Sequence, residues 1–95
     1  MMMKTSSNGD YERIPLDDHQ HFFYTYDLGC AAALSASDYE LVSLDKSNPQ
    51  KVMFIYKKEP GIVRVVDSYW ADKLDLKARK YFESVKMLKN RIYSS

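Results

Sequence analysis

The chain has 95 residues, enough for one domain and too few for two, because two cores would each bury too little apolar surface to be stable alone. Hydrophobic residues make up 45% and charged residues 28% of the chain, as in an ordinary soluble globular protein, and the formal net charge is +1. The longest uncharged apolar run, LGCAAALSA, is far shorter than the roughly 20 residues needed to cross a bilayer, which excludes a membrane-spanning helix.

The beginning of the chain, MMMKTSSNGDYERIP, is polar and lacks the apolar segment of a signal peptide. We therefore expect a flexible polar leader over residues 1–20, a single domain over residues 21–95 and a cytoplasmic location. Cys30, the only cysteine, lies in a small-residue stretch and has no neighbours with the spacing of a zinc site. We expect it to be a buried structural thiol.

The first half of the domain contains signals for one helix and three strands. The aromatic and β-branched run HFFYTYD predicts a strand that ends where Thr25 or Asp27 can cap a helix. The alanine-rich run LGCAAALSAS then predicts a short helix with small side chains. YELVSLD and KVMFIYKK predict two strands, and the five residues KSNPQ between them predict an antiparallel hairpin. The almost wholly apolar centre of the last of these strands is typical of a central strand.

Two helices are predicted for the second half. In EPGIVRVVDSYW, the stripe of Ile62, Val66 and Trp70 favours a helix, although the β-branched residues favour a strand. We expect Trp70 to be a core residue or an interface anchor. A last helix is predicted over residues 76–93, capped by Asp75, with an inward face formed by Ala78, Tyr81, Phe82, Val85, Leu88 and Ile92. The predicted fold is a small three-stranded sheet with packed helices in the order β-α-β-β-α-α, of the α+β class.

Residue patterns of enzymes are scarce. The three glycines lie far apart, so there is no phosphate-binding loop, and no serine has the pattern of a nucleophile elbow. His19 and His21 in DDHQH resemble part of a metal site, but a local cluster lacks the distant ligands that usually complete one. We therefore expect no enzymatic activity, no catalytic residues, no metal and no cofactor.

Charge is segregated along the chain. Residues 1–45 contain two basic and eight acidic residues, a net charge of −6, and residues 46–95 contain twelve basic and five acidic residues, a net charge of +7. In the last helix, Glu83 is the only acidic residue, and the candidate contacts for nucleic-acid phosphates are Arg79, Lys80, Lys86, Lys89 and Arg91. Tyr93 is a candidate for base stacking, whereas Tyr81 and Phe82 are expected to pack inward.

The same basic residues have other interpretations. Lys and Arg are good helix formers, so the basic face can be simply solvated, or it can pair with the acidic first half. Abundant tyrosines, the small core and complementary charges also suit a protein interface. The leading hypothesis is a non-enzymatic module that binds DNA or RNA, and the alternative is a protein-interaction module, either a homodimer or an inhibitor or adaptor of a larger complex.

Several segments together resemble a known family. They are YDLGCAAAL, KVMFIY and ARKYFESVKMLKNR, which fit the pattern YDLGxAAxL … KVxFxY … ARKYFExxKxLKxR. Over residues 22–94 the chain resembles a family of short prokaryotic and phage-associated proteins classed as a domain of unknown function. The resemblance implies a small cytoplasmic protein of a prokaryote or mobile element, and it brings no established activity or catalytic residue.

Overall fold

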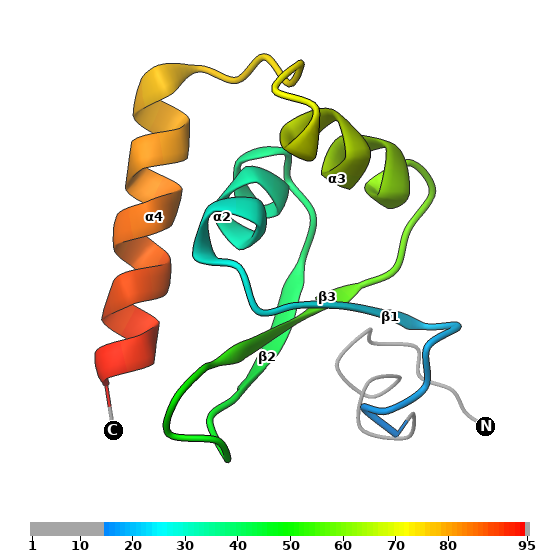
Figure 1. Ribbon diagram of the computed structural model, residues 1–95, viewed down its shortest axis with the longest axis vertical. Helices are drawn as coiled ribbons and strands as arrows, with labels where there is room; N and C mark the ends of the chain where they lie inside the picture. Colours follow the sequence, from blue (N-terminus) through cyan, green and yellow to red (C-terminus); the bar gives the residue numbers. More distant parts are fainter. Residues whose placement is uncertain (1–14, 95) are drawn as a thin grey trace, which may run out of the picture.

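The computed structural model describes residues 15–94 of the chain (Figure 1). The described part has a three-stranded sheet and three helices in the order β-α-β-β-α-α, so the predicted α+β class is confirmed. Figure 1 shows α2 between α3 and α4, with the strands below these helices. The elements are β1 (Phe22–Thr25), α2 (Leu28–Ala36), β2 (Leu41–Asp45), β3 (Met53–Lys57), α3 (Ile62–Trp70) and α4 (Ala78–Tyr93).

β3 is the central strand of the sheet. It pairs antiparallel with β1 on one edge and with β2 on the other. Phe54, Ile55 and Tyr56 are all buried, as the apolar centre of this strand predicts. Because successive side chains alternate across a sheet, Phe54 and Tyr56 point to the helix-covered face and Ile55 points to the other face.

The predicted hairpin of β2 and β3 is confirmed, but its loop spans residues 46–52 instead of the predicted residues 46–50. Two side chains order this loop locally: Asp45 accepts a hydrogen bond from the Ser47 backbone N–H (2.9 Å), and Asn48 accepts one from Gln50 (2.8 Å). Such turns compete with strand pairing, which therefore begins only at Met53.

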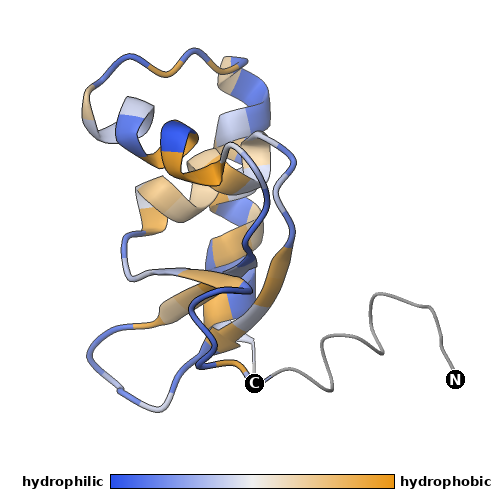
Figure 2. Cartoon of the chain, turned by 90° about the vertical axis from the view of Figure 1, so that its right-hand side faces the viewer, coloured by the Kyte–Doolittle hydropathy of each residue, from blue (hydrophilic) through white to orange (hydrophobic). Residues whose placement is uncertain are grey.

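α2 lies at the centre of the hydrophobic core. Asp27 is its N-cap and accepts a hydrogen bond from the backbone N–H of Cys30 at 2.8 Å. Of the two predicted caps, Thr25 and Asp27, it is therefore Asp27 that caps the helix. The small side chains of α2 let the sheet, α3 and α4 approach it from different sides, and Figure 2 shows apolar residues along α2 and the strands. The core consists of Ala31, Ala32, Leu34, Phe54, Tyr56, Ile62 and Leu88.

α3 confirms the predicted helix in the ambiguous segment. It follows Gly61, whose φ of 91° lies in the left-handed region that favours glycine. Ile62 is buried, whereas Trp70 is 61% exposed. Of the two roles predicted for Trp70, that of a core residue is therefore wrong. Trp70 is turned about 80° from Ile62 around the helix, and its ring meets the Tyr69 ring edge-on at 5.1 Å.

α4 runs along α2 and carries the predicted inward residues Leu88, which is buried, and Ile92, which packs against the core (Figure 1). The helix begins at Ala78 after Lys77, and its N-cap makes no side-chain hydrogen bond, so the predicted cap at Asp75 is wrong. The reason is the segment before the helix, which contains the half-buried Leu74 and Leu76 and has no helical structure up to Lys77.

The predicted leader over residues 1–20 falls mostly on residues 1–14, which lie outside the described residues. Residues 15–21 form turns, and the Tyr24 hydroxyl donates a hydrogen bond to the carbonyl oxygen of Leu16. Among the described helices, none has the length and apolar character that a membrane span requires.

Candidate nucleic-acid interface

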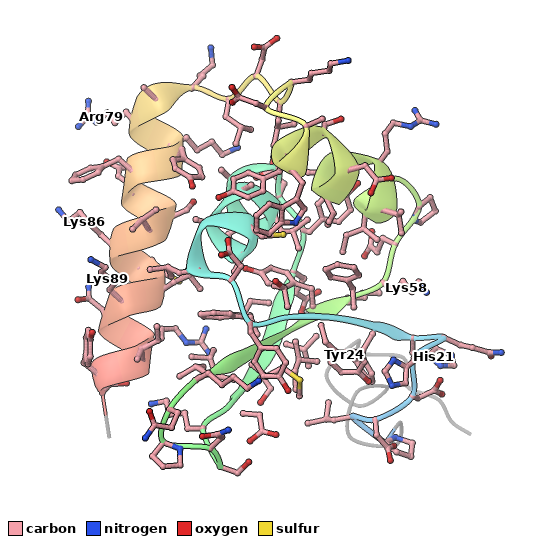
Figure 3. The ribbon with its side chains drawn as sticks, viewed as in Figure 1. His21, Tyr24, Lys58, Arg79, Lys86 and Lys89 are labelled. Carbon is pink, nitrogen blue, oxygen red and sulfur yellow. The ribbon has the colours of Figure 1, made fainter. Side chains whose placement is uncertain are left out.

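Three of the five predicted basic residues share one side of α4. Arg79, Lys86 and Lys89 project from its outer side, away from α2 (Figure 3). With residues 100° apart around the helix, Phe82 and Tyr93 fall on the same side, at alternating steps of three and four. We call Arg79, Phe82, Lys86, Lys89 and Tyr93 the outer stripe.

Lys80 lies outside the outer stripe and is paired with the acidic first half of the chain. Its Nζ lies 3.0 Å from Oδ1 and 3.1 Å from Oδ2 of Asp38. Asp38 lies in the turn after α2 and has a φ of 70°. Among the described residues, this ion pair joins the acidic first half to α4 at Lys80, which lies outside the outer stripe, so the pair leaves the charges of the outer stripe unneutralised.

Arg91 is also separate from the outer stripe, because it lies about 180° from Phe82 around the helix. It is exposed and lies near the buried Tyr56. Burial raises the pKa of Tyr56 to about 12, and the positive charge of Arg91 opposes that rise. The five predicted contact residues are therefore divided between two sides of α4.

Two of the three cations in the outer stripe face solvent without an ionic partner. The Arg79 Nε lies 3.3 Å from the Glu83 Oε2, in a strongly exposed pair that contributes little because water screens it. Lys86 and Lys89 form no ion pair among residues 15–94. The Lys86 Nζ instead lies 5.6 Å from the centroid of the Phe82 ring, within cation–π range.

The prediction that Phe82 packs inward is wrong. Its side chain is 61% exposed, whereas its neighbour Tyr81 is half-buried and donates a hydrogen bond to the Gly29 carbonyl at 3.3 Å. Phe82 lies about 120° from the buried Leu88 around the helix, beyond the sector that α2 covers. Tyr93, at the far end of the outer stripe, is 81% exposed.

A cleft of about 370 Å³ adjoins the end of the outer stripe, and we call it the terminal cleft. Three segments meet there: the β1–α2 connection, the β2–β3 loop and the end of α4. Sequence reasoning missed this cleft because these segments are distant in the chain. The one local signal is Tyr26, an aromatic residue beside the N-cap that belongs to neither element. The lining includes Tyr26, Leu28, Gln50, Lys51, Ile92 and Tyr93.

The histidines of DDHQH have separate neighbours. The His21 Nδ1 lies 2.7 Å from the Asp18 Oδ2, and the Gln20 backbone N–H donates to the Asp18 Oδ1 at 2.9 Å. These two hydrogen bonds lower the pKa of the Asp18 carboxyl, and the bond from Gln20 has the larger effect. The His19 ring instead meets the Tyr24 ring edge-on at 4.7 Å. Within residues 15–94, no three His, Cys, Asp or Glu side chains are placed to hold a metal ion.

A second hollow, of about 410 Å³, lies beside this segment on the sheet face that carries Ile55. Its lining includes the carboxylates of Asp17 and Asp45 as well as Lys46. Carboxylates repel phosphates, so this hollow fits a nucleic acid less well than the outer stripe does.

Cys30 is buried, with 1% exposure, which confirms the predicted buried thiol. Burial raises the pKa of the Cys30 thiol, and the hydrogen bond from Thr25 only partly opposes this. A raised pKa disfavours the reactive thiolate, so the residue acts as a small core side chain.

The fold defines a small α+β domain with a three-stranded antiparallel sheet and three helices within the described part. Residues 20–94 match the family described as a domain of unknown function, DUF5659, and the chain belongs to that family. This match agrees with the resemblance to a domain of unknown function over residues 22–94. No curated protein and no solved structure matches the chain.

Proposed function

We propose that this protein is a non-enzymatic module that binds nucleic acid through the outer stripe of α4. The observation that carries the proposal is the presence of three cations and two exposed aromatic rings along one side of a single helix. Lysines and arginines neutralise phosphates, and exposed rings stack on bases. A helix with both at steps of three and four presents them in one line.

The pairing pattern of the cations supports Lys86 and Lys89 as the main phosphate contacts. A cation that already has a carboxylate partner gains slightly less from a phosphate, because the existing pair, although weak at an exposed site, must first be broken. Lys80 has such a partner in Asp38, and Arg79 has one in Glu83. Lys86 and Lys89 have none in the described part of the chain, and the exposed ring of Phe82 precedes Lys86 on the stripe by one helical turn.

The proposal includes the cellular setting that the resemblance implies, a prokaryotic or phage-encoded protein of the cytoplasm. A buried thiol suits a reducing compartment, and nucleic acid is abundant there. Binding of this kind is a matter of charge and stacking, so the proposal requires no metal or cofactor.

A second candidate function, a protein-interaction module, is favoured by one observation on α3. Val63 and Trp70 are 51% and 61% exposed and fall on the same side of that helix, about 20° apart. Exposed tryptophan is typical of interface hot spots. Light scattering over micromolar concentrations tests the homodimer form, and Trp70→Ala is the variant that should dissociate such a dimer.

Charge reversal tests the nucleic-acid proposal. We expect Lys86→Glu/Lys89→Glu to lower the affinity for a fluorescein-labelled oligonucleotide at low salt by about tenfold or more. The control variant is Arg64→Glu/Lys73→Glu, which changes the net charge equally at two exposed positions on α3 and the following loop. It should retain most of the affinity. Equal losses in the two variants would reduce the effect to net charge, and absence of binding by the unmodified protein to DNA and RNA would reject the proposal.

A further inference from the structure

The terminal cleft has the features of a binding site for a flat, uncharged ring. Its floor includes the buried Phe54 and the side chains of Leu28 and Ile92, which offer an apolar surface. Two aromatic rings, Tyr26 and Tyr93, stand at the cleft and are 54% and 81% exposed. Exposed aromatic rings beside an apolar floor favour stacking with another ring.

The cleft also carries polar groups suited to a nucleotide. The Lys51 Nζ lies over one face of the Tyr26 ring, 4.3 Å from its centroid, which places a positive charge in the cleft. Gln50 adds an amide, which both donates and accepts hydrogen bonds, as the edge of a base requires. Among the described residues that line the cleft, none is acidic.

The walls of the cleft are tied together by hydrogen bonds outside it. The Lys46 Nζ donates to the carbonyl oxygen of Ser94 at 2.8 Å, which links the β2–β3 loop to the end of α4. Within the loop, the Gln50 backbone N–H donates a hydrogen bond to the Asn48 Oδ1 at 2.8 Å. The site therefore exists before a ligand binds, which lowers the entropic cost of binding.

Tyr93 belongs both to the outer stripe and to the terminal cleft. A strand whose phosphates follow Lys86 and Lys89 thus reaches the cleft at the end of the helix. In a duplex the bases are stacked and paired, and only an unpaired base can turn its face toward a protein ring.

From this continuity we infer that the terminal cleft binds one unpaired base, so that the protein is selective for single-stranded nucleic acid. This inference rests on the proposed function of the outer stripe and adds the class of nucleic acid. The terminal cleft has a volume of about 370 Å³, at the lower end of the range of small-ligand pockets, and this size suits a single nucleotide.

The test compares fluorescence anisotropy of a labelled single strand of about ten nucleotides with that of its duplex, for the wild type, Tyr26→Ala and Tyr26→Phe. Oligothymidine and oligouridine arms separate DNA from RNA. We expect the wild type to prefer the single strand. Tyr26→Ala should weaken single-strand binding by roughly tenfold or more without changing duplex binding, and Tyr26→Phe, which keeps the ring, should resemble the wild type.

The outcomes separate the two proposals. Equal affinity of the wild type for single and double strands, or an unchanged single-strand affinity in Tyr26→Ala, overturns the base-binding inference and leaves the outer stripe intact. Failure of the wild type to bind any of the probes overturns both. Because Tyr26 is exposed, its replacement should leave folding unchanged, and a thermal unfolding curve of each variant verifies this.

Discussion

At the scale of single residues, the Tyr56 hydroxyl is a polar group within the hydrophobic core. The side chain has 0% exposure, and its hydroxyl donates to the Ala31 carbonyl at 2.7 Å. Ser35 Oγ lies 2.6 Å away, and because the Tyr56 proton points to Ala31, Ser35 is the donor in that pair. The network joins β3 to α2, and within the described residues no buried side-chain polar atom lacks a partner.

Tyr56→Phe should lower the free energy of unfolding by about 1–2 kcal/mol, because the Ala31 carbonyl and Ser35 lose their buried partner. The effect depends on pH. Burial raises the pKa of Tyr56 from 10.0 to about 12, so its contribution is complete below pH 10 and is lost as the pH rises toward 12. Urea unfolding at neutral pH and at about pH 11 measures this.

The alkaline decline of stability should therefore be shallower in Tyr56→Phe than in the wild type. Part of the decline should persist, because burial, followed by interaction with Tyr81, also raises the pKa of Tyr69 to about 12. Parallel curves for the two proteins would show that Tyr56 ionises equally in the folded and unfolded states, contrary to this account.

At the scale of elements, the contact between α2 and α3 depends on Gly29. The Tyr69 hydroxyl lies against the position that a Cβ of residue 29 would occupy. A methyl group at this position would collide with that hydroxyl, so the Tyr69 side chain of α3 would have to move away from α2, the helix at the centre of the core.

Gly29→Ala should cost about 1–2 kcal/mol, since overpacking outweighs the better helix propensity of alanine. In the Tyr69→Phe background, which removes the hydroxyl, the same change should cost clearly less, although the ring carbon Cζ and the Asp27 Oδ2 still lie 3.2 and 3.3 Å from the Cβ position. A double-mutant cycle by chemical denaturation measures this coupling. Identical costs in both backgrounds would mean that the two residues do not meet.

Mutations on the two sides of α4 should have different effects on oligonucleotide affinity. Lys80→Ala should leave oligonucleotide affinity within about twofold and cost less than about 1 kcal/mol of stability, because the Lys80–Asp38 pair is exposed. Lys86→Ala should weaken binding with no loss of stability. Anisotropy and thermal unfolding of both variants measure this, and an equal loss of affinity would contradict the assignment of contacts to the outer stripe.

Elements with strong local signals could be predicted from the sequence. The alanine run of α2, the apolar centre of β3 and the spacing of α4 specify their own structures, because propensity and periodicity act over short distances. The side on which Phe82 lies could not be predicted, since the width of the covered sector of α4 depends on where α2 packs. Asp75 failed as a cap for a similar reason: Leu74 and Leu76 are partly buried before the helix begins.

At the scale of the whole molecule, the small net charge conceals an uneven distribution of acidic and basic residues. The formal net charge is +1, yet among the described residues the acidic first half meets α4 in an ion pair at Lys80, outside the outer stripe. The outer stripe and the terminal cleft form one continuous surface that ends at Tyr93. Sequence reasoning identified the cations of that surface but could not identify the cleft, which exists only when residues 26, 51 and 93 come together.

The salt dependence of binding tests the central claim, that Lys86 and Lys89 contact phosphates, most directly. The measurement is the slope of log K against log salt concentration for oligothymidine, in the wild type and in Lys86→Ala/Lys89→Ala. Each lost phosphate contact with a single strand lowers the slope by about 0.7, so we predict a slope shallower by about 1.4 in the double variant. A slope identical to that of the wild type would contradict the claim.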